Sequence, residues 1–224
     1  MSDSETGTKG GVFGFCVKAI LFDMDGVLVD SERLHKRADA EVFVAHGLSV
    51  PNEAWDDIFG MRAEEGLRFI LDRYGNGDED ASALADEKRE RYFELVRQGL
   101  DPISGVKEFV VSCCERSLRT GVVTSGRAYY QLPILDRFGF RPLFDVIVTG
   151  DEVMNGKPDP EPYLLAVSRL GLDPAECIVV EDADNGIRSA KAAGCIAVGL
   201  STSLSRERLL AAGADLVIDG FIGY

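Results

Sequence analysis

Six short apolar segments of the chain each end in glycine or polar residues. They lie at 17–23, 120–126, 145–151, 177–183, 195–201 and 214–219. Their Val, Ile and Leu residues run almost without interruption, which is typical of parallel strands buried on both faces. Amphipathic segments that predict helices separate the later strands, at 105–117, 127–138, 160–170, 184–193 and 205–212. This alternation predicts an α/β fold built on a doubly wound parallel sheet.

A long helical segment interrupts this alternation after the first strand. No convincing strand occurs between residues 24 and 119, and the pattern over 32–98 is helical. We therefore expect a helical cap domain over 32–98, inserted into a catalytic core formed by 16–31 and 99–224. An insert at this point would lie above the carboxyl ends of the strands. Open α/β folds bind their ligands at this end of the sheet.

Composition limits the possible partners. The 224 residues are 46% hydrophobic, which is enough for a packed core, and the net charge of -14 argues against a nucleic-acid partner. A small anionic substrate needs only a local positive charge and stays possible. No apolar run approaches membrane-spanning length, so no membrane partner is expected. A monomer or a weak homo-oligomer is expected.

Cysteine usage and the first residues bear on the compartment. The five cysteines lack the spacing of a zinc site. Cys16, Cys177 and Cys195 begin or precede apolar runs and resemble small buried hydrophobic residues, which suits a reducing compartment. Residues 1–15 have neither a basic start nor an apolar centre, so we interpret them as a flexible leader and not as a signal peptide. A cytoplasmic location is expected.

Acidic residues follow two of the predicted strands. Asp23 and Asp25 lie two positions apart and would face the same side of an extended segment, and Glu181 and Asp182 end another strand. Each pair taken alone could serve a turn or a helix start. Parallel strands, however, bring these four carboxylates to one edge, where they repel one another unless a cation holds them. Such oxygen ligands suit Mg²⁺.

Groups that could bind a phosphate lie at the same predicted edge. Thr124, Ser125, Gly126 and Arg127 connect the second strand to a helix start, and a helix N-terminus favours an anion. Lys157 follows the third strand and could offset the phosphate charge. Separately, these residues could be an ordinary helix cap and a surface lysine. Their joint occurrence at successive strand ends favours a phosphate site that uses a bound metal.

Four motifs in order carry a family resemblance. The stretches DMDGVLVDS, VVTSG, GKPDPEPY and VVEDADNGI resemble the four motifs of the haloacid dehalogenase-like hydrolase superfamily. The group with a small helical cap, which includes β-phosphoglucomutase and sugar-phosphate phosphatases, is the most similar. The resemblance covers about residues 16–219 and implies a Rossmann-like core with an inserted α-helical cap.

The resemblance also implies roles for individual residues. Asp23 would be the nucleophile that forms an aspartyl-phosphate, and Asp25 would be the general acid and base. Thr124 and Lys157 would hold the phosphoryl oxygens. The Mg²⁺ ligands would be Asp23, Glu181, Asp182 and the main-chain carbonyl of Asp25.

Two functions stay open at this point. The first is a Mg²⁺-dependent phosphatase acting on a small phosphorylated metabolite such as a sugar or polyol phosphate, with Arg62 and Arg127 as candidates for contacts with the substrate. The alternative is a sugar phosphomutase. His35 and Lys88 match positions that couple cap closure to proton transfer in β-phosphoglucomutase and favour the mutase. Ala63, where the mutase has a phosphate-binding arginine, opposes it.

Overall fold

The computed structural model describes residues 11–51, 54, 58, 63–75, 77 and 79–224. Within this part, the core is a six-stranded parallel sheet with the order β3-β2-β1-β4-β5-β6. The strands are β1 (Ala19–Phe22), β2 (Arg119–Val123), β3 (Val146–Val148), β4 (Cys177–Glu181), β5 (Ile196–Leu200) and β6 (Leu216–Ile218). The predicted doubly wound sheet is confirmed.

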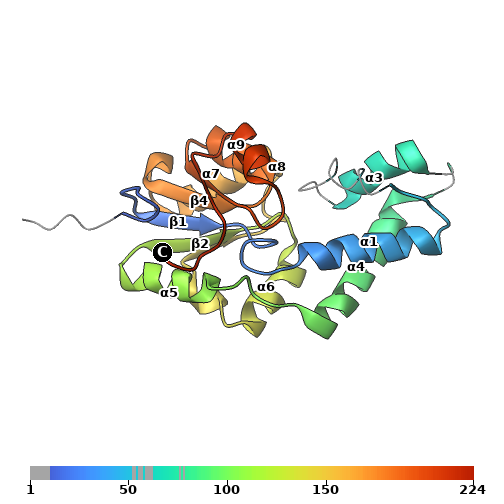
Figure 1. The fold of residues 1–224 in the computed structure, drawn as a ribbon, viewed down its shortest axis with the longest axis horizontal. Coiled ribbons are helices and arrows are strands. Elements are labelled where there is room, and N and C mark those ends of the chain that lie inside the picture. The colour runs from blue at the N-terminus through green and yellow to red at the C-terminus, as the bar shows by residue number, and fades with distance from the viewer. Residues whose placement is uncertain (1–10, 52–53, 55–57, 59–62, 76, 78) are drawn as a thin grey trace, which may run out of the picture.

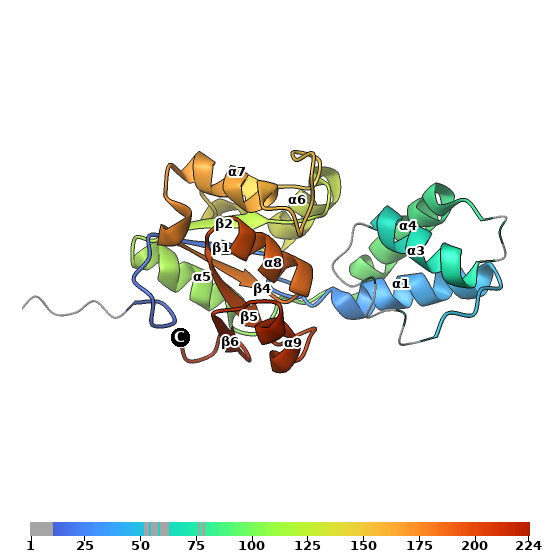
Figure 2. The ribbon, with the colours of Figure 1, turned by 90° about the horizontal axis from the view of Figure 1, so that it is seen from above.

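Helices cover both faces of this sheet (Figures 1 and 2). One face packs against α5 (Val106–Glu115) and α6 (Ala128–Arg137). The other packs against three helices: α7 (Glu161–Leu170), α8 (Asp184–Ala192) and α9 (Arg206–Ala211). Because successive side chains of β1 alternate, Ile20 and Phe22 enter the first cluster and Leu21 enters the second. Short 3₁₀ turns, Arg141–Leu143 and Pro174–Glu176, precede β3 and β4.

The predicted third strand is shorter in the structure than in the sequence pattern. The pattern over 145–151 continues past Val148, where β3 ends. The hydroxyl of Thr149 donates a hydrogen bond of 2.6 Å to Asp151, and its backbone N–H donates one of 2.9 Å to Glu152. These local bonds form a turn, so the backbone leaves the sheet at this point.

Three helices follow β1 and form a separate group, which we call the helical unit. They are α1 (Glu32–Ala45), α3 (Ala63–Tyr74) and α4 (Ala81–Gly99). The unit has its own apolar cluster, in which Phe43, Leu67, Ile70 and Leu84 are buried. It lies beyond the carboxyl ends of the strands (Figure 1). The N-cap of α4 is Asp80, whose side chain accepts a hydrogen bond from the Ser82 N–H.

None of the described helices is long and apolar enough to cross a membrane. The domain boundaries at 32 and 98 stay a prediction.

Residues 11–15, which fall within the expected flexible leader, pack on the core. Val12 is buried in the core cluster, and Phe13 stacks on Phe109 of α5 with ring centroids 5.2 Å apart. Phe13 also meets Tyr224 edge to face at 4.8 Å. The aromatic surface of the α5 side holds this segment, whose two phenylalanines end a stretch rich in Gly, Ser and Thr. Residues 1–10 lie outside the described residues.

Strands β1 and β4 are adjacent although they are far apart in the chain. From β1 the chain builds β2 and β3 on one side, and then returns to build β4, β5 and β6 on the other. Phe22 pairs with Val180, and the Asp23 N–H donates a hydrogen bond of 3.0 Å to the Val180 carbonyl. Asp23 and Glu181 therefore leave the sheet side by side. This is the point where the strand order reverses, and ligands of open α/β sheets bind there.

Candidate active site

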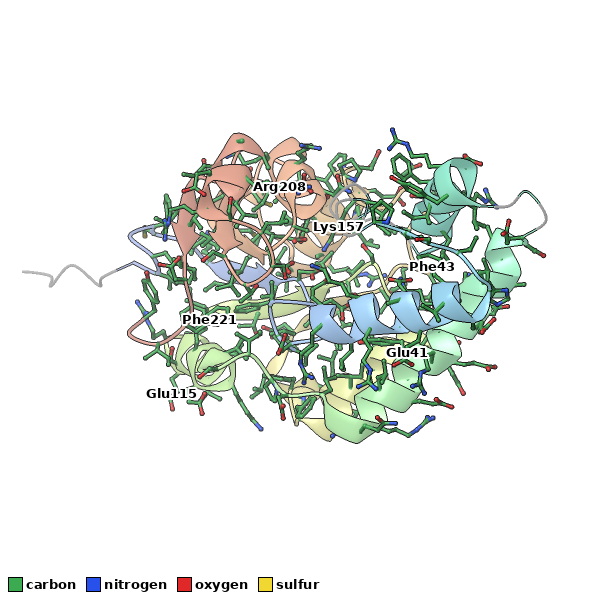
Figure 3. All side chains as sticks on the ribbon, turned by 45° about the vertical axis from the view of Figure 1, so that its right-hand side comes forward. Glu41, Phe43, Glu115, Lys157, Arg208 and Phe221 are labelled. Carbon is green, nitrogen blue, oxygen red and sulfur yellow. The ribbon has the colours of Figure 1, made fainter. Side chains whose placement is uncertain are left out.

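Lys157 joins the ends of β1 and β4. Its ammonium group lies 2.5 Å from Asp23 Oδ1 and 2.6 Å from Glu181 Oε1, and it also donates to the Val123 carbonyl at 3.0 Å. The Tyr163 hydroxyl donates to the same Glu181 oxygen at 2.7 Å. All of these groups are largely buried, so the ion pairs are little screened by solvent. Figure 3 shows Lys157 at the junction of the core and the helical unit.

Three buried carboxylates at this edge could hold a metal ion. Asp23, Glu181 and Asp182 each offer an oxygen, and these oxygens lie within 4.8 Å of one another. The Ser203 hydroxyl donates to Asp182 Oδ2 at 2.5 Å and so orients that carboxylate. Lys157 supplies only one positive charge to the group. The remaining negative charge and the oxygen-only donors fit a hard divalent cation.

The charges within this cluster shift one another's pKa. Burial raises the pKa of Asp23 well above its ordinary value, Lys157 opposes this shift, and Glu181 adds to it. Burial also raises the pKa of Asp182, and the nearby Asp23 adds to the shift. For Lys157, burial alone would lower the pKa, but the carboxylates of Asp23 and Glu181 outweigh it and raise the pKa above its ordinary value. Lys157 is therefore a permanent cation beside Asp23.

Asp25 belongs to a different hydrogen-bond network. The Ser31 hydroxyl donates to its Oδ1 at 2.5 Å, and the Gln131 amide donates to its Oδ2 at 3.1 Å. His35 Nε2 lies 3.6 Å from the same Oδ1. Burial alone would raise the pKa of Asp25, but His35, Ser31 and Gln131 together lower it below its ordinary value. The two aspartates thus have different environments, and their pKa values are shifted in opposite directions.

Two glycines make the close packing of the carboxylates possible. Gly26 has φ +76°, and a Cβ atom there would overlap the Asp182 carboxylate and approach Ser203 Oγ to 2.8 Å. A Cβ at Gly186 would overlap the Glu181 carboxylate. Because glycine has no Cβ, the backbone of the first loop can approach the end of β4 closely.

A cavity of about 500 Å³ opens above this cluster. The sheet edge contributes Asp23, Asp25, Lys157, Glu181 and Asp182 to its wall. From the predicted phosphate-binding segment, the lining includes Ser125, Gly126 and Arg127. The described residues that line it do not include Thr124, which is buried and accepts a hydrogen bond of 3.0 Å from the Gly126 N–H. Its hydroxyl therefore supports the turn that carries Ser125 and Gly126.

The helical unit supplies the opposite wall of the cavity. His35 lines the cavity and stacks on Tyr92, with ring centroids 3.9 Å apart and planes inclined by 5°. Lys88 also lines it and forms an ion pair of 2.7 Å with the buried Asp39. Arg62, which was predicted to contact the substrate, lies outside the described residues.

Sequence reasoning missed several residues that orient the predicted ones. Gln131, Ser203 and Tyr163 each bond a carboxylate of the site. Gln131 lies one helical turn after Arg127, and Ser203 follows the fifth strand, so both lie near the sheet edge that the sequence indicated. Which carboxylate each of them contacts depends on how the helices and strands pack in three dimensions, which the sequence pattern does not show.

The chain matches the Haloacid dehalogenase-like hydrolase family over residues 20–200 and belongs to it. It is 34% identical over 208 residues to the validoxylamine A 7'-phosphate phosphatase of Streptomyces hygroscopicus subsp. limoneus. This match covers 90% of this chain and 92% of the relative. It is also 34% identical over 207 residues to the phosphorylated carbohydrates phosphatase of Thermotoga maritima, and this match covers 90% of this chain and 94% of that relative.

Solved structures support the same assignment. A crystal structure of a CbbY mutant from Rhodobacter sphaeroides in complex with xylulose-(1,5)bisphosphate superposes with a TM-score of 0.80 and 29% identity. The match covers 92% of this chain and 95% of that chain. The family resemblance drawn from the four motifs is therefore confirmed.

Proposed function

We propose that this protein is a Mg²⁺-dependent phosphatase that hydrolyses a small sugar or polyol monophosphate through an aspartyl-phosphate. The observation that carries the proposal is the different setting of two neighbouring aspartates. Asp23 lies 2.5 Å from the Lys157 ammonium group and beside the acidic cluster, whereas Asp25 is bonded to Ser31 and Gln131. Asp23 therefore lies where a cation and a bound metal could hold a phosphoryl group, and Asp25 lies where it could exchange a proton with the substrate oxygen.

In the first step, an oxygen of Asp23 attacks phosphorus and forms a new P–O bond. The bond between phosphorus and the substrate oxygen breaks, and Asp25 gives its proton to that leaving oxygen. Lys157 stabilises the negative charge of the phosphoryl oxygens, together with the backbone N–H of Ser125. A Mg²⁺ ion held by Asp23, Glu181, Asp182 and the Asp25 carbonyl would offset further phosphoryl charge.

In the second step, water attacks the phosphorus of the aspartyl-phosphate. Asp25, now ionised, accepts the proton of this water, and the bond to Asp23 breaks to release inorganic phosphate. The hydrogen bonds from Ser31 and Gln131 hold Asp25 in place for both transfers. The helical unit acts as a cap that excludes bulk water during the first step.

The substrate class follows from the cavity and from the relatives. A volume of about 500 Å³ suits a small molecule. The name of the Thermotoga maritima relative states that it acts on phosphorylated carbohydrates. Since Asp23, Lys157 and Asp182 supply the groups for phosphoryl transfer, the helical unit would choose among such substrates.

The test is phosphate release from hexose, hexitol and p-nitrophenyl monophosphates, with Mg²⁺ or with a chelator. The proposal expects turnover only with the metal, and its loss in Asp23→Asn, because an amide cannot form the aspartyl-phosphate. Asp136→Asn, which changes an exposed acid on α6, is the matched control. Metal-independent release, or release by Asp23→Asn, would reject the proposal. Conversion of a hexose 1-phosphate into its 6-phosphate would instead establish the mutase.

A further inference from the structure

Two helices of the helical unit place four polar side chains against each other above the site. His35 and Asp39 are one turn apart on α1, and Lys88 and Tyr92 are one turn apart on α4. His35 stacks on Tyr92, and Asp39 pairs with Lys88 at 2.7 Å. All four line the cavity. Only His35 and Lys88 were singled out from the sequence.

Among the described residues, three buried side-chain atoms have no hydrogen-bond partner: Asp39 Oδ1, Tyr92 Oη and Gln131 Oε1. Asp39, Tyr92 and Gln131 are 4%, 5% and 6% exposed, so solvent does not compensate for the missing bonds. An unsatisfied buried polar atom costs about 1–3 kcal/mol. All three residues line the same cavity. Gln131 contacts Asp25, and Asp39 and Tyr92 belong to the helical unit. This concentration at one site indicates that a ligand supplies the missing partners.

The chemistry of these atoms defines what the ligand must offer. Gln131 donates its amide N–H to Asp25, so its free atom is a carbonyl oxygen, which only accepts. Asp39 Oδ1 is a carboxylate oxygen and also only accepts, whereas the Tyr92 hydroxyl can donate or accept. The ligand must therefore carry hydrogen-bond donors. The terminal torsions of Asp39 and Gln131 are soft, so a small rotation turns each oxygen toward a bound molecule.

The charges of the cavity oppose a second phosphate at this place. Its described lining contains seven acidic and six basic side chains. At least three of the basic ones are already paired: Lys88 with Asp39, Arg89 with Asp86, and Lys157 with Asp23 and Glu181. Neutral hydroxyl groups need no further positive charge, and they are the donors that the unpaired acceptors lack.

We propose that Asp39, Tyr92 and Gln131 form a hydroxyl-binding subsite, with Lys88 orienting Asp39, that selects a polyhydroxylated monophosphate. The inference rests on the proposed function, because it assigns the hydroxyls of that substrate to these residues while its phosphate lies at Asp23 and Lys157. A substrate of the same length without hydroxyls leaves the three atoms unpaired and loses affinity.

The experiment measures binding and not turnover. Calorimetry in the Asp23→Asn background with Mg²⁺ compares sorbitol 6-phosphate with n-hexyl phosphate, which has the same chain length and no hydroxyls. In this background, Asp39→Asn replaces the free acceptor by a donor, and Tyr92→Phe removes one hydroxyl but keeps the stack on His35. The matched control is Glu41→Gln, because Glu41 lies on the same helix (Figure 3) but pairs with Arg37 and Arg91.

Sorbitol 6-phosphate is expected to bind about 10-fold or more weakly to the Asp39→Asn variant and about 3- to 10-fold more weakly to the Tyr92→Phe variant. The affinity for n-hexyl phosphate should change less than about 2-fold, and the Glu41→Gln control should alter neither affinity. A partly unfolded variant lowers the binding-competent fraction for both ligands equally, so their affinity ratio stays informative.

An unchanged affinity ratio in both variants overturns the subsite, as does equal binding of the two ligands to the parent protein. Failure of the proposed function gives a different result. In that case the affinity ratio responds to the substitutions as expected, but the protein with Asp23 intact releases no phosphate from sorbitol 6-phosphate in the presence of Mg²⁺.

Discussion

The ammonium group of Lys157 lies 2.5 Å from Oδ1 of Asp23, although 134 positions separate the two residues in the chain. The same nitrogen lies 2.6 Å from Glu181 Oε1. One cation thus joins the ends of β1 and β4 where the strand order reverses. In the proposed reaction, it counteracts the effect of burial on the pKa of Asp23, favours the ionised form that attacks, and then stabilises the phosphoryl group that Asp23 receives.

Lys157→Met should abolish most activity. The substitution removes the charge that stabilises the transferring phosphoryl group, and loss of one such group typically costs about 10²–10³ in kcat. It also leaves Asp23 and Glu181 as buried acids without their common partner, which should lower the free energy of unfolding by about 3–5 kcal/mol at neutral pH. Phosphate-release kinetics and urea unfolding measure the two effects. Lys18→Met removes an exposed lysine paired with Glu176 and should change neither. Full activity in Lys157→Met would refute the role.

The metal-free protein should become more stable as pH falls from the alkaline side of neutrality toward the ordinary titration range of a carboxyl group. The pKa values of Asp23 and Asp182 are raised by folding, so the folded protein binds protons that the unfolded chain releases. Stability from this source is present at low pH and is lost as pH rises through the raised pKa values. Each proton bound in excess contributes about 1.4 kcal/mol per pH unit. Saturating Mg²⁺ should remove this dependence, because it binds the ionised carboxylates.

Urea unfolding over this pH range, with a chelator or with Mg²⁺, measures both effects. Asp182→Asn should weaken the pH dependence of the metal-free protein and reduce the stabilisation by Mg²⁺. A metal-free protein whose stability rises steadily with pH over the same range would contradict the prediction.

His35→Phe should move the alkaline limb of the pH profile for kcat/KM to higher pH. Burial favours the protonated form of Asp25, and His35 is the first of the groups that oppose it and lower the pKa. Removing His35 therefore raises the pKa of Asp25, which then keeps the proton needed for the leaving oxygen at higher pH. Phenylalanine preserves the stack on Tyr92. His46→Phe removes the other histidine, which pairs with Glu87, and should leave the profile unchanged. An unshifted limb in His35→Phe would count against this role of Asp25.

Gly26→Ala should disrupt the acidic cluster. The residue has φ +76°, and its new Cβ would overlap the Asp182 carboxylate. Gly47→Ala is the matched control, because Gly47 has φ +70° and nothing lies within 4 Å of its Cβ position. Both variants should lose about 1 kcal/mol of stability from backbone strain. Only Gly26→Ala should also bind Mg²⁺ more weakly. Thermal unfolding with and without Mg²⁺ measures the difference, and equal Mg²⁺ effects in the two variants would contradict it.

The sequence predicted the sheet because its strands carry a strong local signal. The strand from Cys177 to Glu181 is buried at every position, so its unbroken apolar run reflects two covered faces. Asp23 and Glu181 could be placed together for the same reason, since parallel strands share their carboxyl edge. The end of β3 was missed because the side-chain bonds of Thr149 decide it, and these compete with the sheet only locally.

The sequence could not predict contacts between side chains of separate elements. Gln131 contacts Asp25 across 106 positions, and neither residue carries a pattern that names the other. Asp39 has the spacing of an ordinary helix residue, and its pairing with Lys88 depends on how α1 packs on α4. Phe13 lies at the end of a stretch rich in Gly, Ser and Thr, yet the aromatic ring of Phe109 holds it on the core. Such pairings become visible only in three dimensions.

The most direct test of the account is the site of phosphorylation. The protein with Asp25→Asn should transfer the phosphoryl group to Asp23 slowly and lose it more slowly still, because Asp25 assists both steps. Rapid quenching in acid, followed by mass spectrometry of the peptide that contains residues 19–33, measures this intermediate. The account predicts one phosphoryl group on Asp23 in the presence of Mg²⁺, and none when Asp23→Asn is added. Turnover without a phosphorylated peptide, or a phosphoryl group on another residue, would contradict it.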